Sequence, residues 1–415
     1  MLPVSSATSE WTPFWDAFFT ATSALCVTGQ ITVNTALHWS WFGKLVIISL
    51  IQVGGLGFMS FILLFFFVTG RRINIRQQKI VQESLNLDDI SEAKSLIRYV
   101  LQFSLTTEFI AAVLLAFDFV PRLGWRRGLI YSAFHSVSAF CNAGFDLFGD
   151  SLYGFQDNPY VLTIIALLII FGGLGFIVWR DLMTYHKNKK LLLHTRLVVI
   201  TTGIMLVGGF VLFMISESLH GTFKHLSFVD QLFNNFFMAV TPRTAGYSNV
   251  DYNTVSIGGR VLTYILMFIG GSSGSTAGGM KITTVSVLWI YFTSVIKGHE
   301  PVFQKRSISV TRVRQALFLL VVSLLIIVTG TMVLAITQQF PNGYGLDALL
   351  MEVFSCFGTV GLSMGLTPYL NSFGKFILMV IMFVGRVGAV TVIWSFKRDD
   401  KESKIHYPEG NILVG

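Results

Sequence analysis

Seven long apolar segments constrain the fold of this chain more than any other feature of its sequence. A helix needs about 20 mostly apolar residues to cross a bilayer. Segments of this kind lie at residues 43–69, 96–118, 159–183, 195–217, 257–296, 312–338 and 374–396. Charged residues make up only 13% of the chain, against roughly 25% in an ordinary soluble domain. The sequence therefore predicts an all-α polytopic membrane protein in the lipid bilayer, and it excludes a soluble globular chain.

The fifth apolar segment is about twice as long as one span requires, and its centre is rich in glycine and serine. Residues 270–281 read GGSSGSTAGGMK, a run with almost no helix propensity. A bilayer tolerates such a break only where the unwound backbone lines a cavity or is buried in protein. We therefore expect a broken helix in this segment.

Basic residues gather in short stretches between the spans. Residues 70–98, 184–196, 297–314 and the tail from 397 hold 19 of the 30 Lys and Arg residues. The positive-inside rule places these stretches in the cytoplasm. The net charge of +8 is thus divided among loops rather than spread over one face, which excludes nucleic acid as a partner. The remaining stretches face outside, where aromatic-rich segments too short to span predict re-entrant helices.

Self-comparison shows that these outer segments are four copies of one pattern. They begin at Trp15, Ser132, Asp230 and Asp347, and each ends in a loop with a glycine, at Gly29, Gly144, Gly246 and Gly361. Successive glycines are 115, 102 and 115 residues apart. A second glycine signature follows 24 to 28 residues later in the next span, as GGLGF at 54–58 and 172–176, GG at 270–271 and GRVG at 385–388. Packing could explain one such glycine, but four in register indicate a repeat of span, re-entrant loop and span.

The repeat pattern divides the chain into five parts. Repeat 1 covers residues 1–70, repeat 2 covers 71–186, repeat 3 with the broken helix covers 187–300, repeat 4 covers 301–396, and 397–415 form a cytoplasmic tail. Repeat 1 lacks its leading span, because only about ten residues precede its re-entrant helix. We therefore expect that the chain is shortened or that its start is misassigned.

Four such loops around one pseudo-fourfold axis can form a selectivity filter. A re-entrant helix points the negative end of its dipole at the membrane centre, which favours a cation. The loop after it can turn backbone carbonyls toward the axis, because glycine accepts positive φ, and rings of carbonyls replace the water of a monovalent cation. The candidate filter residues are Val27, Thr28, Gly29, Asn142, Ala143, Gly144, Thr244, Ala245, Gly246, Thr359, Val360 and Gly361.

These residues resemble the Trk/Ktr/HKT superfamily of potassium transporters, and most closely the bacterial Ktr-type membrane subunit. The resemblance covers the whole chain; its motifs are the four filter loops, the two GGLGF runs, TPRTAG at 241–246, the broken helix and FVGRVG at 383–388. It implies a pseudo-fourfold pore within one subunit of the bacterial cytoplasmic membrane, normally with eight spans. It also implies a homodimer with a cytoplasmic nucleotide-binding regulatory ring of the KtrA type.

Further implications of the resemblance concern the ion. Potassium is the transported ion, and Gly29 argues for potassium over sodium, because family members with serine at this position tend to admit sodium. No covalent cofactor and no metal beyond K⁺ in the filter are expected. Nucleotide would act only through the partner, since the chain has no Walker-type phosphate loop. The basic loops 70–95 and 297–314 are candidate docking surfaces for that partner, although setting the topology could be their whole role.

Arg386 leads to a hypothesis for a gate. It lies in the last span at the repeat position of Gly55, Gly173 and Gly271, so symmetry places it beside the pore, beneath the filter. A fixed positive charge there repels a cation unless it is paired or moved. The candidate gate residues are Gly270, Gly271, Ser272, Ser273, Gly274, Ser275, Thr276, Ala277, Gly278, Gly279, Lys281 and Arg386. In the alternative interpretation, Arg386 only ties helix ends through backbone carbonyls.

Other polar residues within the apolar segments favour structural roles. We expect Arg243 to form an ion pair that holds its loop, with Glu352 or Asp230, or else to slow cation entry. Lys281 either snorkels or anchors its loop locally. Glu108 and Asp118 are expected to be packed or paired, since two carboxylates are too few for a proton relay.

The remaining candidates for chemistry are weaker still. Asp16, Asp230 and Asp347 begin three re-entrant helices and suit their N-termini. The eight histidines, including His135, show no metal-ligand spacing,. Cys26, Cys141 and Cys356 stand far apart and are expected to be buried small hydrophobic residues.

Two competing functions can be weighed on the sequence. A secondary cation transporter with a broken-helix site at the midplane would show inverted two-fold halves, whereas this chain shows four parallel repeats. An enzyme would need a nucleophile, a base and an orienting group at one depth, and the ionisable groups within the spans are scattered. The sequence thus predicts potassium uptake through a channel-like pore, and no enzymatic activity.

Overall fold

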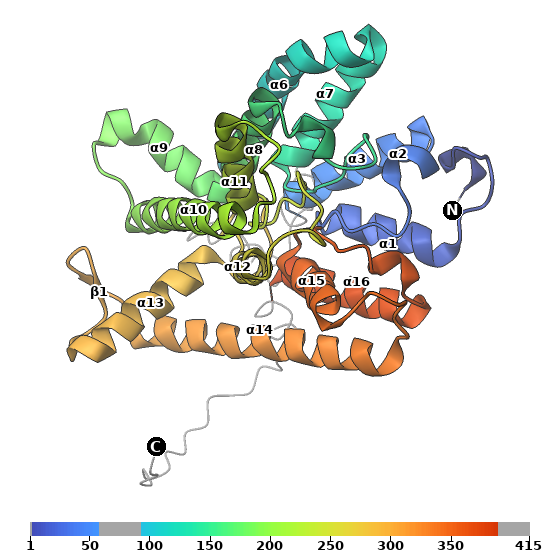
Figure 1. Cartoon of the computed structure of the whole chain (residues 1–415). Coiled ribbons are helices and arrows are strands. Elements are labelled where there is room, and N and C mark those ends of the chain that lie inside the picture. Colours follow the sequence, from blue (N-terminus) through green and yellow to red (C-terminus); the bar gives the residue numbers. More distant parts are fainter. Residues whose placement is uncertain (1, 58–92, 389–415) are drawn as a thin grey trace.

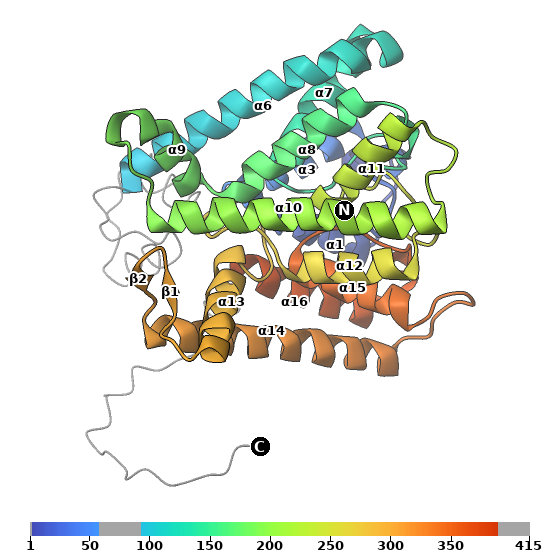
Figure 2. The same ribbon diagram turned by 60° about the vertical axis from the view of Figure 1, so that its left-hand side comes forward.

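The computed structural model describes residues 2–57 and 93–388 and is predominantly helical within them. Three of its helices are long and apolar enough to cross a membrane, namely α6 (Ala93–Leu123), α10 (Leu193–His220) and α14 (Val310–Thr337). They match the predicted spans at 96–118, 195–217 and 312–338. Figure 2 shows them extending across the molecule in the same general direction.

Four shorter apolar helices occupy the other predicted spans. They are α3 (Trp41–Gly55), α8 (Pro159–Leu174), α12 (Ile257–Phe268) and α16 (Ser372–Val387). Each begins with a polar side chain that accepts a hydrogen bond from the backbone N–H three residues later, at Ser40, Asn158, Ser256 and Asn371. Such caps satisfy an N–H group that the first helical turn leaves free. The remainder of the predicted spans 43–69 and 374–396 lies outside the described residues.

The predicted span at 159–183 is sharply bent. Helix α8 ends at Leu174, and α9 (Phe176–Asn188) leaves it at an angle of 94°. Gly175 between them has φ +97°, a conformation that L side chains rarely adopt. The apolar run continues through this point, but the glycine turns the backbone. By contrast, the predicted break in 257–296 is confirmed, since α12 ends at Phe268 and α13 (Ile282–Lys297) begins after the glycine-rich stretch.

Four short helices coincide with the predicted re-entrant segments. They are α1 (Phe14–Leu25), α7 (Trp125–Phe140), α11 (Phe228–Val240) and α15 (Leu346–Gly358). Asp16, Asp230 and Asp347 lie in the first turns of three of them, as expected. Helix α7 begins seven residues before Ser132, where the sequence comparison started. A carboxylate in the first turn stabilises the helix because its negative charge is attracted to the positive end of the helix dipole.

The short helices pack on their neighbours in cyclic order. Helix α7 contacts α3, α11 contacts α8, α15 contacts α12, and α1 contacts α16. Figure 1 shows the last of these pairs, in which the first helix of the chain lies beside the last. Three of the short helices also pack against the long helix that precedes them, as α6 with α7, α10 with α11 and α14 with α15.

The remaining elements are small and lie in connections. They are the 3₁₀ turns Pro3–Ser5, Tyr153–Phe155 and Thr367–Tyr369, helix α2 (Thr35–His38), and strands β1 (Val302–Phe303) and β2 (Arg306–Ser307). The two strands form an antiparallel hairpin, so the expected all-α class holds except for this turn between α13 and α14. The proposed repeat boundaries stay predictions.

The cyclic packing closes through an ion pair. Lys375 on α16 lies 2.7 Å from Asp16 on α1, and both side chains are mostly buried. We expect Asp16→Asn to lower the stability of the protein by about 1–3 kcal/mol, because it leaves the ammonium without its charged partner. The thermal unfolding midpoint of the detergent-solubilised protein measures this effect.

A double variant separates the ion pair from other effects of the substitution. Asp16→Lys combined with Lys375→Asp restores the pair in reverse and is expected to recover part of the lost stability. If the double variant is as unstable as the two single variants combined, the contact between these charges does not hold α1 against α16.

Candidate functional site

The loops after the four short helices share one unusual backbone conformation. Their first residues, Val27, Asn142, Thr244 and Thr359, have φ of +57°, +58°, +75° and +49°. The glycines two positions later, Gly29, Gly144, Gly246 and Gly361, have φ of +84°, +66°, +78° and +96°. A left-handed conformation costs a residue other than glycine about 1–2 kcal/mol. Strain repeated at four equivalent positions indicates a functional constraint.

The same glycines bring the four loops into contact with one another. A Cβ atom on Gly144 would lie 2.6 Å from the carbonyl oxygen of Ala245, and one on Gly29 would overlap that of Ala143. The corresponding contacts join Gly246 to the carbonyl of Val360, and Gly361 to the carbonyl of Thr28. The contacts run in one cyclic order and return to the first loop. The structure thus brings all four predicted filter loops together, with the carbonyl group of each second residue against the glycine of a neighbouring loop.

Backbone and hydroxyl groups of the short helices hold these loops. The N–H groups of Thr28, Ala143 and Val360 each donate 2.8 Å to the carbonyl five residues earlier. Ser138 Oγ donates to the carbonyl of Phe145 at 2.8 Å, and Thr241 Oγ1 donates to that of Tyr247 at 2.5 Å. Because the loops follow the helix C-termini and touch one another, the negative ends of four helix dipoles converge. This arrangement favours a cation at the centre.

Two buried side chains behind the loops accept hydrogen bonds from them, and this role was not identified from the sequence. His135 and Glu352 stand nine residues before Gly144 and Gly361, and both are fully buried. His135 Nε2 accepts from the N–H of Leu147 at 3.3 Å. Glu352 accepts from Ser363 Oγ at 2.6 Å and Thr367 Oγ1 at 2.7 Å. Their equal offset from the filter glycines was the signal that could have found them.

The expected ion pair of Arg243 is wrong. Glu352 is occupied by hydroxyl and backbone donors, and Asp230 accepts a hydrogen bond from Ser227 Oγ at 2.6 Å. Within residues 2–57 and 93–388, no carboxylate lies within ion-pair distance of Arg243. Its side chain is 7% exposed, and its Nε has no hydrogen-bond partner there. The loop is held by Thr241 instead, and the alternative role of Arg243 in cation entry stays a prediction.

The glycines of the second signature lie directly behind the loops. A Cβ atom on Gly54, Gly172 or Gly385 would overlap the carbonyl oxygen of Leu25, Phe140 or Phe357. Leu25 and Phe140 are the last residues of α1 and α7, and Phe357 is the last but one of α15. Glycine is required because the second helix of these three units crosses the end of its short helix at backbone contact, whereas a Cβ atom on Gly270 in the third unit would overlap the carbonyl oxygen of Gly278. Gly57, Gly175 and Gly388 then turn the chain with φ of +86°, +97° and +91°.

The glycine- and serine-rich stretch 270–281 spans the space between these helix ends. Ser272 N donates to Gly173 O at 3.0 Å, and Thr276 N donates to Gly172 O at 3.2 Å, which attaches it to α8. Gly279 N donates to Gly385 O at 3.1 Å, which attaches it to α16. The stretch is therefore held between α8 and α16 by backbone hydrogen bonds. Lys281 Nζ donates to Ala277 O at 2.6 Å, as the local-anchor interpretation expects.

Arg386 connects this stretch to α3. Its guanidinium donates to the carbonyls of Thr276 and Gly54, and Nη2 lies 3.4 Å from the carbonyl of Gly55. These contacts agree with the interpretation that Arg386 ties helix ends through backbone carbonyls. No carboxylate within the described ranges forms an ion pair with it. The twelve predicted gate residues thus form one connected set, whose role in gating stays a prediction.

The remaining polar candidates have structural partners. Asp118 lies 2.9 Å from Arg122 and accepts from Asn158 at 2.9 Å, and Glu108 accepts from Gln52. Both are therefore paired, as expected. Cys26, Cys141 and Cys356 are buried and free. Over the residues described, no cluster of His, Cys, Asp and Glu could hold a metal ion.

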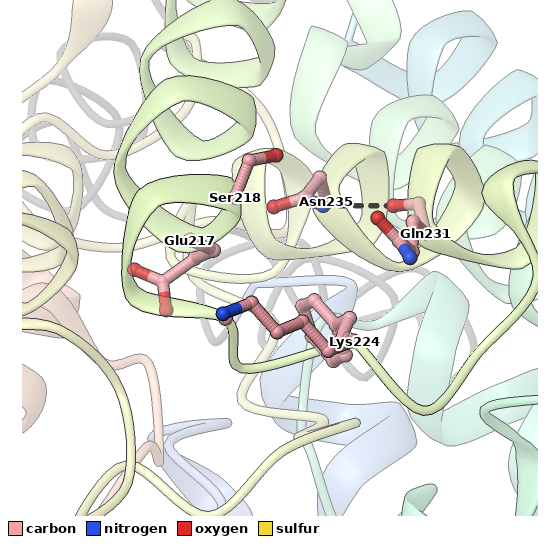
Figure 3. Close-up of a pocket in the computed structure, with 7 residues that line it drawn as sticks. Glu217, Ser218, Lys224, Gln231 and Asn235 are labelled. Atoms are coloured by element: carbon pink, nitrogen blue, oxygen red, sulfur yellow. Dashed lines mark hydrogen bonds between the residues drawn. The ribbon is translucent and has the colours of Figure 1, made fainter.

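A small cavity of about 50 Å³ between α10 and α11 is separate from the loops. Figure 3 shows its lining, which includes Glu217, Lys224 and Asn235. Glu217 is occupied, since it accepts from Ser256 Oγ at 2.6 Å and Thr222 Oγ1 at 2.5 Å. None of the predicted filter or gate residues lines this cavity.

Comparison with known proteins places the chain in a family. The family model described as "TrkH: Cation transport protein" matches residues 2–405. The chain is 46% identical to the potassium/sodium uptake protein NtpJ of Enterococcus hirae and 42% identical to the Ktr system potassium uptake protein B of Bacillus subtilis. In both cases it is matched over 100% of its own length and 92% of theirs.

A solved structure shows the same fold. The crystal structure of the potassium transporter TrkH from Vibrio parahaemolyticus matches with a TM-score of 0.72 at 19% identity, over 93% of this chain and 79% of that one. The predicted resemblance to the Trk/Ktr/HKT superfamily is confirmed by the family model and by the relatives above. The chain belongs to the TrkH family of cation transport proteins, and it is a multi-pass membrane transport protein rather than an enzyme.

Proposed function

We propose that this protein takes up potassium across the bacterial cytoplasmic membrane through one pore formed by four repeats of a single chain. The observation that carries the proposal is the closed cycle of contacts between four filter glycines and four carbonyl groups. Potassium is the ion common to the relatives, one of which is named a potassium/sodium uptake protein and the other a potassium uptake protein. Backbone carbonyls at the meeting point of four helix C-termini suit a dehydrated monovalent cation.

Repeated local chemistry supports the fourfold interpretation. The helix caps Ser40, Asn158, Ser256 and Asn371 each stand 14 residues before the first glycine of the second signature. Basic residues stand ten positions before that glycine in three of the four units, at Lys44, Arg260 and Lys375. Two of these cations pair with first-turn carboxylates, as Arg260 with Asp347 and Lys375 with Asp16. Such recurrence is expected of four copies of one unit.

A secondary transporter with a midplane site is the alternative function. That class is built from two inverted halves around discontinuous helices. Here the short helices follow one another in a single cyclic order, and all four second helices end or turn at a glycine signature. These observations favour a channel-like pore. The break at 270–281 then belongs to one of its four repeats.

We assign the gate to the stretch 270–281 and Arg386. The stretch is bound to α8 and α16 behind the filter loops, and Arg386 adds α3 to the set. A positive charge in this place opposes a cation in the pore. Arg386 is held by neutral carbonyls, so its release does not strand a buried partner charge. Opening then consists of withdrawal of the stretch together with Arg386.

The partners of the pore are the last part of the proposal. The chain forms a homodimer, and a cytoplasmic nucleotide-binding ring of the KtrA type controls it. The basic stretch 297–314 supports this assignment, because it contains the hairpin of β1 and β2 and is exposed over much of its length. The docking stretch 70–95 lies mostly outside the described residues.

Substitution of a filter glycine tests the pore. Gly29→Ser is expected to lower the ratio of rubidium to sodium influx several-fold, because a side chain at φ +84° would overlap the carbonyl of Ala143 and displace the ring,. The measurement is ion influx in cells that lack potassium uptake and express the protein with its cytoplasmic partner. Gly203→Ser on α10 is the control, since nothing lies within 4 Å of that position. Equal selectivity in Gly29→Ser and wild type would contradict the assignment of the filter.

Removal of the guanidinium tests the gate. Arg386→Ala is expected to raise rubidium influx several-fold in the absence of the activated partner, because the contacts to α3 and to Thr276 are lost. Replacement of residues 272–278 by a short linker should act in the same direction. Arg126→Ala, on an exposed arginine near the start of α7, is the control. Unchanged influx in both gate variants at normal protein levels would show that these residues do not close the pore.

A further inference from the structure

A buried polar pair lies next to the contacts of Arg386 and belongs to neither the filter nor the gate residues. Glu108 lies near the middle of α6 and is 5% exposed. Its carboxylate oxygens accept from Gln52 Nε2 at 3.0 and 3.2 Å. Gln52 lies in the last turn of α3, two residues before Gly54. A carboxylate at bilayer depth is costly, so its retention at this place calls for a reason.

The geometry connects this pair to the gate through the end of α3. Gly54 and Gly55 close that helix, and their carbonyls face Arg386. Cys141 packs against the same turn, where a Cβ atom on Gly55 would lie 2.7 Å from Cys141 Cβ. Its thiol lies 3.9 Å from Gln52 Oε1 and 4.0 Å from Glu108 Oε1. The last turn of α3 is therefore contacted by Glu108 through Gln52, by Cys141 and by Arg386.

This turn needs support from outside its own helix. The last carbonyls of a helix have no partner within it, and glycine gives the backbone more freedom than any other residue. A fixed side chain in the same turn limits that freedom. Gln52 is such a side chain, because its amide is tied to a carboxylate on α6. The backbone of Glu108 is held in turn, since its backbone carbonyl accepts a hydrogen bond from Ser136 Oγ on α7 at 2.5 Å.

We propose that Glu108 and Gln52 form a brace that positions the end of α3, so that the carbonyls of Gly54 and Gly55 hold Arg386 and keep the gate closed. This inference rests on the gate proposed above and adds two positioning residues to it. The brace acts through hydrogen bonding, because Glu108 contacts the α3 terminus through Gln52 and Cys141, whereas Arg386 donates to backbone carbonyls. Loss of the brace lets the turn move and releases Arg386 more often.

The test is a double-mutant cycle in the full chain, with rubidium influx measured without the activated partner. Gln52→Leu and Glu108→Met each remove the hydrogen bond, and each is expected to raise basal influx about fivefold, the factor that one typical hydrogen bond gives. Glu108→Gln keeps an acceptor for the amide and should stay near wild type. Asp118→Asn, on the same helix but paired with Arg122, is the matched control.

The Arg386→Ala background identifies the route by which the brace acts. If the brace works through Arg386, then Gln52→Leu gives no further rise in that background. An equal rise in both backgrounds would mean general loosening of the pore and would overturn the inference. So would unchanged influx in Gln52→Leu and Glu108→Met proteins that elute as single species at normal levels. If Arg386→Ala raises basal influx and Gln52→Leu does not, the brace is overturned and the proposed gate stands. If Arg386→Ala leaves basal influx unchanged, both the gate and the brace are overturned.

Discussion

The contact between the glycine of one loop and the carbonyl of the next is the constraint on which the rest of this structure depends. At Gly29, Gly144, Gly246 and Gly361 any side chain would collide with a neighbouring carbonyl. Only glycine lets the four loops approach closely, and only positive φ gives them their shape,. The short helices must then point their C-termini at one centre, and the longer helices surround them. The central chemistry is therefore made by backbone, which explains why the predicted filter carries no acidic side chain.

Directly behind this ring, backbone acceptors also take the place of charged partners. Arg386 is bound by carbonyls of α3 and of the stretch 270–281, and that stretch is bound to α8 and α16 by its own N–H groups. An ion pair with a buried carboxylate would be difficult to break, because separation leaves an uncompensated charge. A hydrogen bond from the guanidinium to a neutral carbonyl leaves no unpaired anion behind when it breaks. The proposed gate, assembled from such bonds, would open and close, provided that the helix ends are held in place by groups outside it.

The sequence predicted the four filter loops, the short helices before them and the break at 270–281, because glycine spacing and span length are local signals. It missed the turn at Gly175, since the apolar run from 159 to 183 is continuous and the glycine signature there was used only to align repeats. It assigned Arg243 an ion pair from charge alone, yet Glu352 is occupied by Ser363 and Thr367. The caps 14 residues before each second signature were visible in the sequence and would have strengthened the repeat.

By itself, the sequence determined the class of protein, and it predicted the spacing of the four loop glycines. Apolar length decides whether a helix can enter a bilayer, and a repeated spacing shows where equivalent backbone turns lie. Only the tertiary structure decided which loop touches which, what holds Arg386, and how Gln52 meets Glu108. Arg386 and Gly54 are separated by 332 residues, and Gln52 and Glu108 by 56. Such contacts depend on how helices pack around one another, and no local pattern in one sequence specifies them.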